Sequence, residues 1–141
     1  GTHTYNEKSD SLMNFVPLIL GEKLGKDITS KLVEGLKQKG RFICDFGITT
    51  ESMKSFYYDS CGYWSGPVWG PATTIICYGL FVSGEVELAK EIAKKYCDNM
   101  VKNGTSENFN SQTGKAQEDR AYTWTTSAFL ILASFLESGD F

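Results

Sequence analysis

Five helical segments are predicted along the chain, and they alternate between two kinds. Segments that are apolar on nearly every face lie at about 11–24, from Pro71 to about Phe81, and at 123–138. Segments with one apolar stripe and one charged face lie between them, at about 27–39 and 84–102. A one-sided helix lies at a surface, whereas a helix that is apolar all round is buried on every side. The alternation therefore predicts two concentric layers: an all-α fold, a partial (α/α)6 toroid built from helical hairpins.

Local signals set the ends of these helices. Pro17 should kink or restart the first segment, because proline removes a backbone donor and clashes with the preceding turn. Asp27 is the expected cap of the second segment and Gly40 its expected terminator. Pro71 suits the first turn of the third. The candidate N-caps of the first segment are Ser9, Asp10 and Ser11.

A loop of fixed shape is predicted at 61–71. This stretch holds two Trp, one Tyr, three Gly and two Pro in eleven residues, a density that no ordinary helix or strand tolerates. Flat aromatic faces on such a loop suit a sugar, since the apolar face of a sugar ring packs on an indole. The alternative is an ordinary corner of the core, with Trp64 and Trp69 buried under a turn.

The two long connections should meet at one end of the toroid. The segments 40–71 and 103–122 each run from an outer helix to an inner one, so both lie at the mouth above the inner helices, together with residues 1–10. The second connection carries Glu107, a carboxylate that would face the aromatic loop. A carboxylate beside an aromatic pocket is half of a glycosidase site. The alternative for Glu107 is a solvated loop residue or a partner of Arg120.

Composition excludes several classes of function. The formal net charge of −3 gives no basic patch, so nucleic acid is not an expected partner. The sequence contains no run of about 20 apolar residues, so no membrane span is predicted. One histidine, His3, excludes a histidine-based metal centre, and no cofactor is expected. The four cysteines, Cys44, Cys61, Cys77 and Cys97, match no zinc or redox spacing. Cys77 and Cys97 lie in helical apolar stretches and should be reduced core thiols.

Four motifs in order resemble a known family. The stretch Tyr63-Trp64-Ser65-Gly66-Pro67-Val68-Trp69 is similar to the "GYW-R/Q-GPVW" signature of the (α/α)6-barrel α-glycosidases. These include the family 63 glycoside hydrolases (processing α-glucosidase I and bacterial relatives), the mannosylglycerate hydrolases and the trehalases. The segment 107–114 resembles their "E-x-Y/F-x-x-x-T-G", 122–128 resembles their "F-x-W-T/S-A-A" helix start, and 14–18 resembles the preceding inner helix. The Glu107 segment favours family 63 over trehalase.

The resemblance implies an inverting hydrolase of α-glucosidic or related linkages in an oligosaccharide or disaccharide. Glu107 would be the general base that activates water, and inversion would place the two carboxyl groups roughly 6.5–9.5 Å apart. The substrate would be bound by residues of the matching motifs: Tyr63, Trp64, Gly66, Pro67, Trp69, Tyr122 and Trp124. Ser65 stands where the family has Arg or Gln, and Gly70 replaces a common Pro, which leaves the identity of the sugar open.

The general acid of this family is an Asp on an earlier loop, and the chain has fewer helices than a complete barrel. Residues 1–141 are therefore interpreted as one domain, the C-terminal part of a catalytic barrel. The N-terminal part would be its partner, the chain alone would be inactive, and exposed apolar helix faces would favour self-association. No motif marks a mouth-side Asp as the acid: Asp45, Asp59 or Asp119.

Two other interpretations remain open from the sequence. The chain could be a helical domain that binds a carbohydrate or a protein without catalysis, using the same aromatic loop. An Asp-bearing helical region upstream would favour the enzyme over this binding domain. A purely structural scaffold is the third interpretation, and it predicts that Trp64 and Trp69 are both buried.

Overall fold

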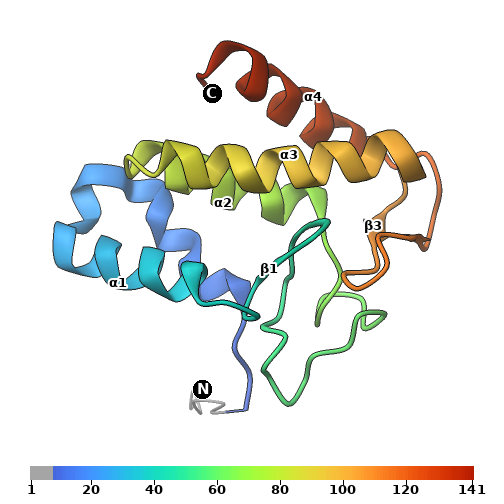
Figure 1. The fold of residues 1–141 in the computed structure, drawn as a ribbon, viewed down its shortest axis with the longest axis horizontal. Helices are drawn as coiled ribbons and strands as arrows, with labels where there is room; N and C mark the ends of the chain where they lie inside the picture. Colours follow the sequence, from blue (N-terminus) through green and yellow to red (C-terminus); the bar gives the residue numbers. More distant parts are fainter. Residues whose placement is uncertain (1–7) are drawn as a thin grey trace, which may run out of the picture.

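The computed structural model describes residues 8–141, and it contains the five helical segments that the sequence predicts (Figure 1). The helices are the 3₁₀ helix η1 (Leu12–Leu24) and the α-helices α1 (Lys26–Lys37), α2 (Gly70–Val82), α3 (Val86–Asn103) and α4 (Thr123–Ser138). Four strands of two residues lie in the connections: β1 (Ile43–Cys44), β2 (Gly47–Ile48), β3 (Asn108–Phe109) and β4 (Ala116–Gln117). These strands were not predicted, because two residues are too few to show a period of two.

Helix α2 is the centre of the arrangement. It packs against η1 on one side and α4 on the other, and α3 runs along it (Figure 1). Helix α1 packs on η1, so η1 with α1 and α2 with α3 form two successive hairpins. The predicted alternation of inner and outer helices is therefore present, with η1, α2 and α4 as the inner row.

The inner helices are not buried on every side, and that expectation is wrong for the described residues. Each of the three exposes large apolar side chains that in a closed ring would meet further helices. On the first and last helices these exposed faces match the prediction of open flanks. The side chains are Met13, Ile19 and Leu20 on η1, Ile75 and Tyr78 on α2, and Leu130 and Ile131 on α4.

The first helix breaks at Gly21 and not at Pro17. Pro17 lies within the 3₁₀ helix, whereas Gly21 has a left-handed backbone with φ of 53°. A Cβ at Gly21 would lie 2.9 Å from the carbonyl oxygen of Val82, so the close approach of η1 to the end of α2 requires glycine there. Ser11 is the N-cap, and its hydroxyl accepts a hydrogen bond from the backbone N–H of Met13 at 3.2 Å.

The predicted ends of α1 need correction, and that of α2 is confirmed. Gly25 is the N-cap of α1, so Asp27 lies in the first turn, where its negative charge interacts favourably with the helix dipole. The helix ends before Gln38, and Gly40, with φ of 67°, turns the chain two residues later. Pro71 lies in the first turn of α2 as expected.

Short backbone pairings join the two long connections at one end of the molecule. Strand β1 pairs antiparallel with β2, and β3 pairs antiparallel with β4. Single bridges link the connections to each other: Thr49 pairs with Val68, and Val68 pairs with Phe109. The backbone N–H groups of Val68 and Phe109 each donate to the other's carbonyl, at 2.8 and 3.0 Å. The predicted meeting of the two connections at one mouth is therefore confirmed.

The segment before η1 is fastened to the same end. Both oxygens of Asp10 accept hydrogen bonds from the Arg41 guanidinium, at 2.7 and 2.8 Å. The buried carboxylate of Glu51 accepts the backbone N–H of Asp10 at 2.7 Å. Residues 8–10 thus lie beside the first connection as expected, while residues 1–7, with His3, lie outside the described part of the chain.

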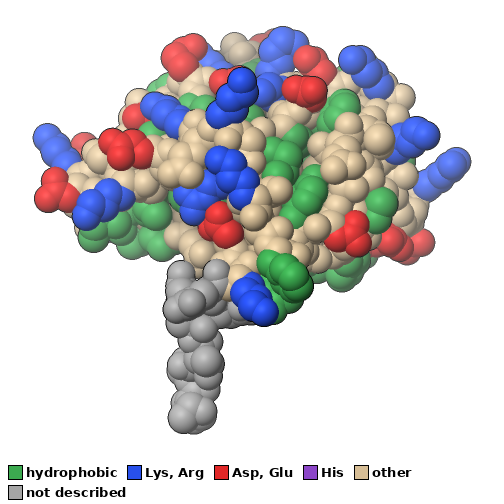
Figure 2. Space-filling view, turned by 60° about the horizontal axis from the view of Figure 1, so that its bottom comes forward, with side chains coloured by type: hydrophobic (Ala, Val, Ile, Leu, Met, Phe, Trp, Pro, Cys, Tyr) green, Lys and Arg blue, Asp and Glu red, His purple; other side chains and the backbone are tan. Residues whose placement is uncertain are grey.

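Charged side chains of both signs are interspersed over the face seen in Figure 2, with apolar side chains between them. Across residues 8–141, no helix is long and apolar enough to cross a membrane. The four cysteines are free, and Cys77 and Cys97 are buried thiols as predicted. Burial raises the pKa of Cys97 to about 11, so this thiol stays protonated at neutral pH.

Candidate active site

Two stacked indoles form the centre of the mouth. Trp64 lies flat on Trp69, with ring centroids 3.9 Å apart and an angle of 13° between the planes. Trp69 is 0% exposed and Trp64 is 42% exposed, so one face of Trp64 is covered and the other is open. Trp124, from the start of α4, meets both rings edge-on. The structural-scaffold interpretation, which required both stacked indoles to be buried, fails at Trp64.

Tyr63 is held in an unusual backbone conformation beside this stack. Its φ of 54° is left-handed, which non-glycine residues rarely adopt. Its carbonyl accepts a hydrogen bond from the indole N–H of Trp69 at 2.7 Å. Its ring packs edge-on against Trp69, with centroids 5.0 Å apart at 82°. The buried indole therefore fixes both the backbone and the ring of Tyr63.

Glu107 comes from the other connection and reaches the same cluster. Its backbone N–H donates to the carbonyl of Asp119 at 2.7 Å, and its carbonyl accepts the Thr125 hydroxyl at 3.3 Å. These bonds tie Glu107 to the β3–β4 hairpin and to the start of α4. Its carboxylate atom Oε1 accepts the Tyr63 hydroxyl at 3.3 Å, although the residue is only 7% exposed.

The alternatives for Glu107 are not what the structure shows. The residue is buried, so it is not a solvated loop side chain. Among residues 8–141 it forms no ion pair, and in particular none with Arg120. Partial loss of solvent and the negative charge of Glu107 raise the pKa of Tyr63. Tyr63 therefore keeps its proton at neutral pH and donates it to the carboxylate.

Gly66 and Pro67 shape the loop from beneath its surface. Both are buried. A Cβ at Gly66 would overlap the backbone carbonyl of Asp59, so this crossing of the loop requires glycine. The carbonyl of Pro67 accepts both the N–H and the hydroxyl of Thr50, at 3.3 and 3.1 Å. These two predicted site residues therefore hold the loop and offer no side-chain contact at its surface.

Tyr122 and Trp124 border an apolar groove at the start of α4. Tyr122 is the N-cap of α4, and its ring lies tilted against Trp124 with centroids 4.9 Å apart. The groove has a volume of about 530 Å³ and runs between α2 and α4, where Ile75 and Ile131 also line it. Sequence reasoning did not foresee this groove, because it depends on how two apolar helices pack.

Asn110 is a further residue that the sequence analysis did not single out. Its amide oxygen accepts the backbone N–H groups of Gln112 and Thr113, at 2.9 and 3.0 Å. Its amide nitrogen donates across to the other connection, to Ser60 Oγ and Cys61 Sγ, both at 3.2 Å. One buried side chain thus forms the turn after Glu107 and ties it to the aromatic loop. Its place three residues before Thr113-Gly114 was the available signal.

No mouth-side aspartate forms a hydrogen bond with the Glu107 carboxylate. Asp45, Asp59 and Asp119 are all exposed. The Asp59 side chain accepts the N–H of Cys61 at 2.8 Å and so closes a turn. Asp119 contacts Glu107 only through its backbone carbonyl. Among residues 8–141, no group of three potential metal ligands is present.

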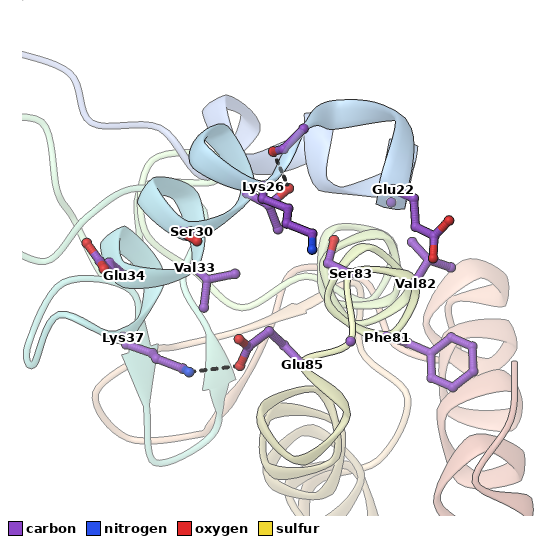
Figure 3. A pocket seen from close by; sticks show the side chains of 14 residues that line it. Glu22, Lys26, Ser30, Val33, Glu34, Lys37, Phe81, Val82, Ser83 and Glu85 are labelled. Atoms are coloured by element: carbon purple, nitrogen blue, oxygen red, sulfur yellow. Dashed lines mark hydrogen bonds and ion pairs between the residues drawn. The ribbon is translucent and has the colours of Figure 1, made fainter.

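A larger hollow, of about 920 Å³, lies between α1 and the turn that joins α2 to α3 (Figure 3). Charged side chains face it, including Lys37 and Glu85, which form an ion pair at 2.8 Å. The ring of Phe81 points away from it and packs edge-on against Phe135. Without an open aromatic face, this hollow does not have the features of a sugar site.

A family profile for the mannosylglycerate hydrolase MGH1-like glycoside hydrolase domain matches residues 5–125. The chain belongs to this family. The predicted likeness to family 63 glycoside hydrolases is therefore confirmed. No curated protein matches the chain in sequence.

Solved structures share the fold of this MGH1-like domain. The GH63 mannosylglycerate hydrolase from Thermus thermophilus in complex with Tris and D-glycerate matches with a TM-score of 0.77 at 22% identity, over 88% of this chain and 29% of that one. The same enzyme in complex with glucose matches with a TM-score of 0.71 at 22% identity, over 88% of this chain and 30% of that one. An uncharacterized conserved protein from the same organism matches with a TM-score of 0.75 at 20% identity, over 88% of this chain and 31% of that one.

These structures confirm the predicted fold class, part of a helical toroid. The MGH1-like chain spans less than a third of the length of each of them. The exposed apolar faces of η1, α2 and α4 are consistent with that share, because a partial ring leaves its helices without some of their neighbours.

Proposed function

We propose that this chain provides the general base and part of the sugar-binding surface of an inverting glycoside hydrolase. Glu107 is the base. The observation that carries the proposal is its nearly buried carboxylate, which accepts the Tyr63 hydroxyl at the edge of the half-exposed Trp64 ring. Glycoside hydrolysis uses a pair of carboxyl groups, and Glu107, beside an open aromatic face that suits a sugar ring, would supply one of them. Membership of a glycoside hydrolase family supports the same reaction class.

The sugar would pack on the exposed aromatic faces. Trp64 offers its open face, and the exposed rings of Tyr63 and Trp124 each meet it edge-on. Stacking of a sugar ring on an indole contributes through burial of apolar C–H groups, while nearby polar groups set the orientation. The remaining predicted contacts act differently: Trp69, Gly66 and Pro67 support the surface from below, and Tyr122 borders it at the α2–α4 groove.

In the proposed reaction the Glu107 carboxylate removes a proton from water as that water attacks the anomeric carbon. A second carboxyl group protonates the leaving oxygen from the opposite side, at a separation of roughly 6.5–9.5 Å. The resemblance places the family's acid on an earlier loop, and no mouth-side Asp lies in a matching motif, so we assign the acid to a part of the barrel that this chain does not contain. The purified 141-residue chain should therefore show no appreciable turnover of α-linked disaccharides.

The substrate class is an α-linked oligosaccharide or disaccharide. The family is named for mannosylglycerate hydrolases, and a solved relative of similar fold is described in complex with D-glycerate. Mannosylglycerate and α-glucosides are accordingly the first compounds to assay. Ser65 stands in place of the expected Arg or Gln, so the preferred sugar need not be that of the relatives. The same assay decides this.

The test is the substitution Glu107→Gln in a polypeptide that contains this chain and the rest of the barrel. General-base catalysis contributes roughly 10²–10⁴-fold, so kcat should fall by that factor while KM changes little. The matched control is Asp119→Asn, which removes an exposed carboxylate from a residue that meets Glu107 only through its backbone, and it should leave kcat within about twofold. Activity of Glu107→Gln within a few-fold of the parent would refute the assignment.

A second candidate is a domain that binds a carbohydrate or a protein without catalysis. The observation in its favour is that no hydrogen bond links the Glu107 carboxylate to a second carboxyl group among the described residues. In that case Glu107→Gln would weaken sugar binding, and no polypeptide containing the chain would release product. Proton NMR of the reaction mixture separates the two candidates, because an inverting hydrolase releases the anomer opposite to that of the substrate.

A further inference from the structure

We infer that Tyr63 is a positioning residue, whose hydroxyl holds one oxygen of Glu107 and leaves the other free to act on water. This inference rests on the proposed role of Glu107 as the base. The hydroxyl donates to Oε1 at 3.3 Å. Among residues 8–141, Oε2 accepts no hydrogen bond from a side chain or backbone N–H. The geometry therefore distinguishes the two oxygens, and Oε2 is the one that takes the proton from water.

The donor is rigid on three sides. The carbonyl of Tyr63 is bound by the indole N–H of Trp69 at 2.7 Å. The ring packs edge-on against both indoles, with centroids 5.0 Å from Trp69 and 6.2 Å from Trp64. A side chain fixed in this way loses little entropy when it binds the carboxylate, so a long hydrogen bond can still orient it. Its left-handed φ of 54° is the kind of local strain that surrounding structure maintains at functional sites.

Few charged groups compete for the hydroxyl. Glu107, from the segment before β3, is the charged group that acts on the pKa of Tyr63 most strongly; the Trp64 side chain acts in the opposite direction, and Tyr122, from the start of α4, acts weakly. Loss of solvent and the charge of Glu107 both raise the pKa of Tyr63, so the donor is protonated at neutral pH. A phenylalanine at 63 would keep the ring contacts and lose only the donor.

The hydrogen bond can be tested on the 141-residue chain without any activity. Tyrosine labelled with ¹³C at Cζ reports the ionisation of each hydroxyl, and the Tyr63 signal is the one that Tyr63→Phe removes. Glu107→Gln should move the Tyr63 titration to lower pH, because the negative charge that opposes tyrosinate is gone. Asp119→Asn is the matched control and should leave it in place. An unchanged Tyr63 titration in Glu107→Gln would overturn the inference.

The positioning role is tested in a polypeptide that contains the complete barrel. Tyr63→Phe should lower kcat by roughly 10- to 100-fold with KM within about twofold, the loss expected for one hydrogen bond to a charged group. Trp64→Phe should instead raise KM, because it alters the sugar contact. A Tyr63→Phe variant that changes only KM would overturn the positioning role, since the residue would then act on the substrate alone.

Failure of the proposed function is distinguishable from failure of this inference. If Glu107→Gln retains kcat, Glu107 is not the base, and the positioning role falls with it even where the Tyr63 titration shifts. If Glu107→Gln loses kcat and the Tyr63 titration does not move, the base assignment stands and only Tyr63 is excluded. Circular dichroism of each variant shows that it is folded, and should Tyr63→Phe unfold, the Glu107→Gln titration decides the hydrogen bond.

Discussion

The same substitution should affect different properties at the two stacked indoles, stability at one and sugar affinity at the other. Trp69 is fully buried and donates to the Tyr63 carbonyl, whereas Trp64 is 42% exposed. We predict that Trp69→Phe costs mainly stability and that Trp64→Phe costs mainly sugar affinity. The residues are of the same type and lie on one loop, so each variant is the control for the other.

The expected loss for Trp69→Phe has two parts. Removal of the partly buried N–H···O bond to Tyr63 costs about 1 kcal/mol of unfolding free energy. Truncating a buried Trp to Ala costs about 3–5 kcal/mol, and Phe fills much of that space, so the remaining cavity costs about 1–2 kcal/mol. The sum is about 2–3 kcal/mol. Trp64→Phe removes part of one stacking contact from an exposed ring, and this should lower the unfolding free energy by about 1 kcal/mol or less.

Urea unfolding of the 141-residue chain, followed by far-ultraviolet circular dichroism, measures both free energies. For a domain of this length the Trp69→Phe variant should melt about 5–10 °C below the parent. Acrylamide should quench the emission of Trp64 and Trp124 in the parent and leave that of Trp69 protected, since the last is 0% exposed. A Trp64→Phe variant less stable than Trp69→Phe would refute the stacking order on which the site is built.

Local contacts carry three further predictions. Gly66→Ala should cost about 1–3 kcal/mol and change the near-ultraviolet circular dichroism, because its Cβ would overlap a backbone carbonyl across the loop. The Arg41 hydrogen bonds lower the pKa of Asp10 from its ordinary 3.8. The stability that they add is therefore complete above pH 3.8 and is lost as the pH falls through the lower pKa of the folded state. Urea unfolding should accordingly show that the difference in stability between the parent and Asp10→Asn disappears in acid. The chain should self-associate through its open apolar faces, as measured by light scattering. Leu130→Lys should weaken this association, whereas the control Val101→Lys, at an exposed position of the outer helix α3, should not. A parent chain that is strictly monomeric would contradict the prediction.

Helix content and the meeting of the loops could be predicted because both follow from long-range pattern. The charged face of α3 repeats along the whole helix, with Lys95 placed to reach Glu91 as it does at 2.8 Å. Once inner and outer helices were told apart, connectivity alone placed both outer-to-inner segments at one end. The contact between Tyr63 and Glu107 across that end is the physical consequence.

What the sequence could not supply lies within the loops. Strands of two residues such as Asn108–Phe109 have no detectable period, and their pairing is set by contacts between distant segments. Trp64 and Trp69 are equivalent by composition, and only the three-dimensional path of the loop decides which is covered. The break at Gly21 likewise depends on the approach of Val82 from α2, which lies far along the chain and leaves no local signal.

We predict that Ser65, in place of the Arg or Gln of the family motif, changes the sugar preference of the proposed site. An Arg or Gln there would be long enough to reach a sugar hydroxyl. The Ser65 hydroxyl instead donates to the carbonyl of Gly62 at 2.6 Å and closes a turn of the loop itself. The same turn precedes Gly66, where the backbones cross too closely for a side chain. In the proposed site, Trp64 keeps its open face and Glu107 its carboxylate, whereas Ser65 as it stands offers its hydroxyl to the loop and not to a sugar. Substitutions that alter sugar preference should accordingly succeed at Ser65 and fail at Trp69, since only the first can change its reach without removing the support of Tyr63.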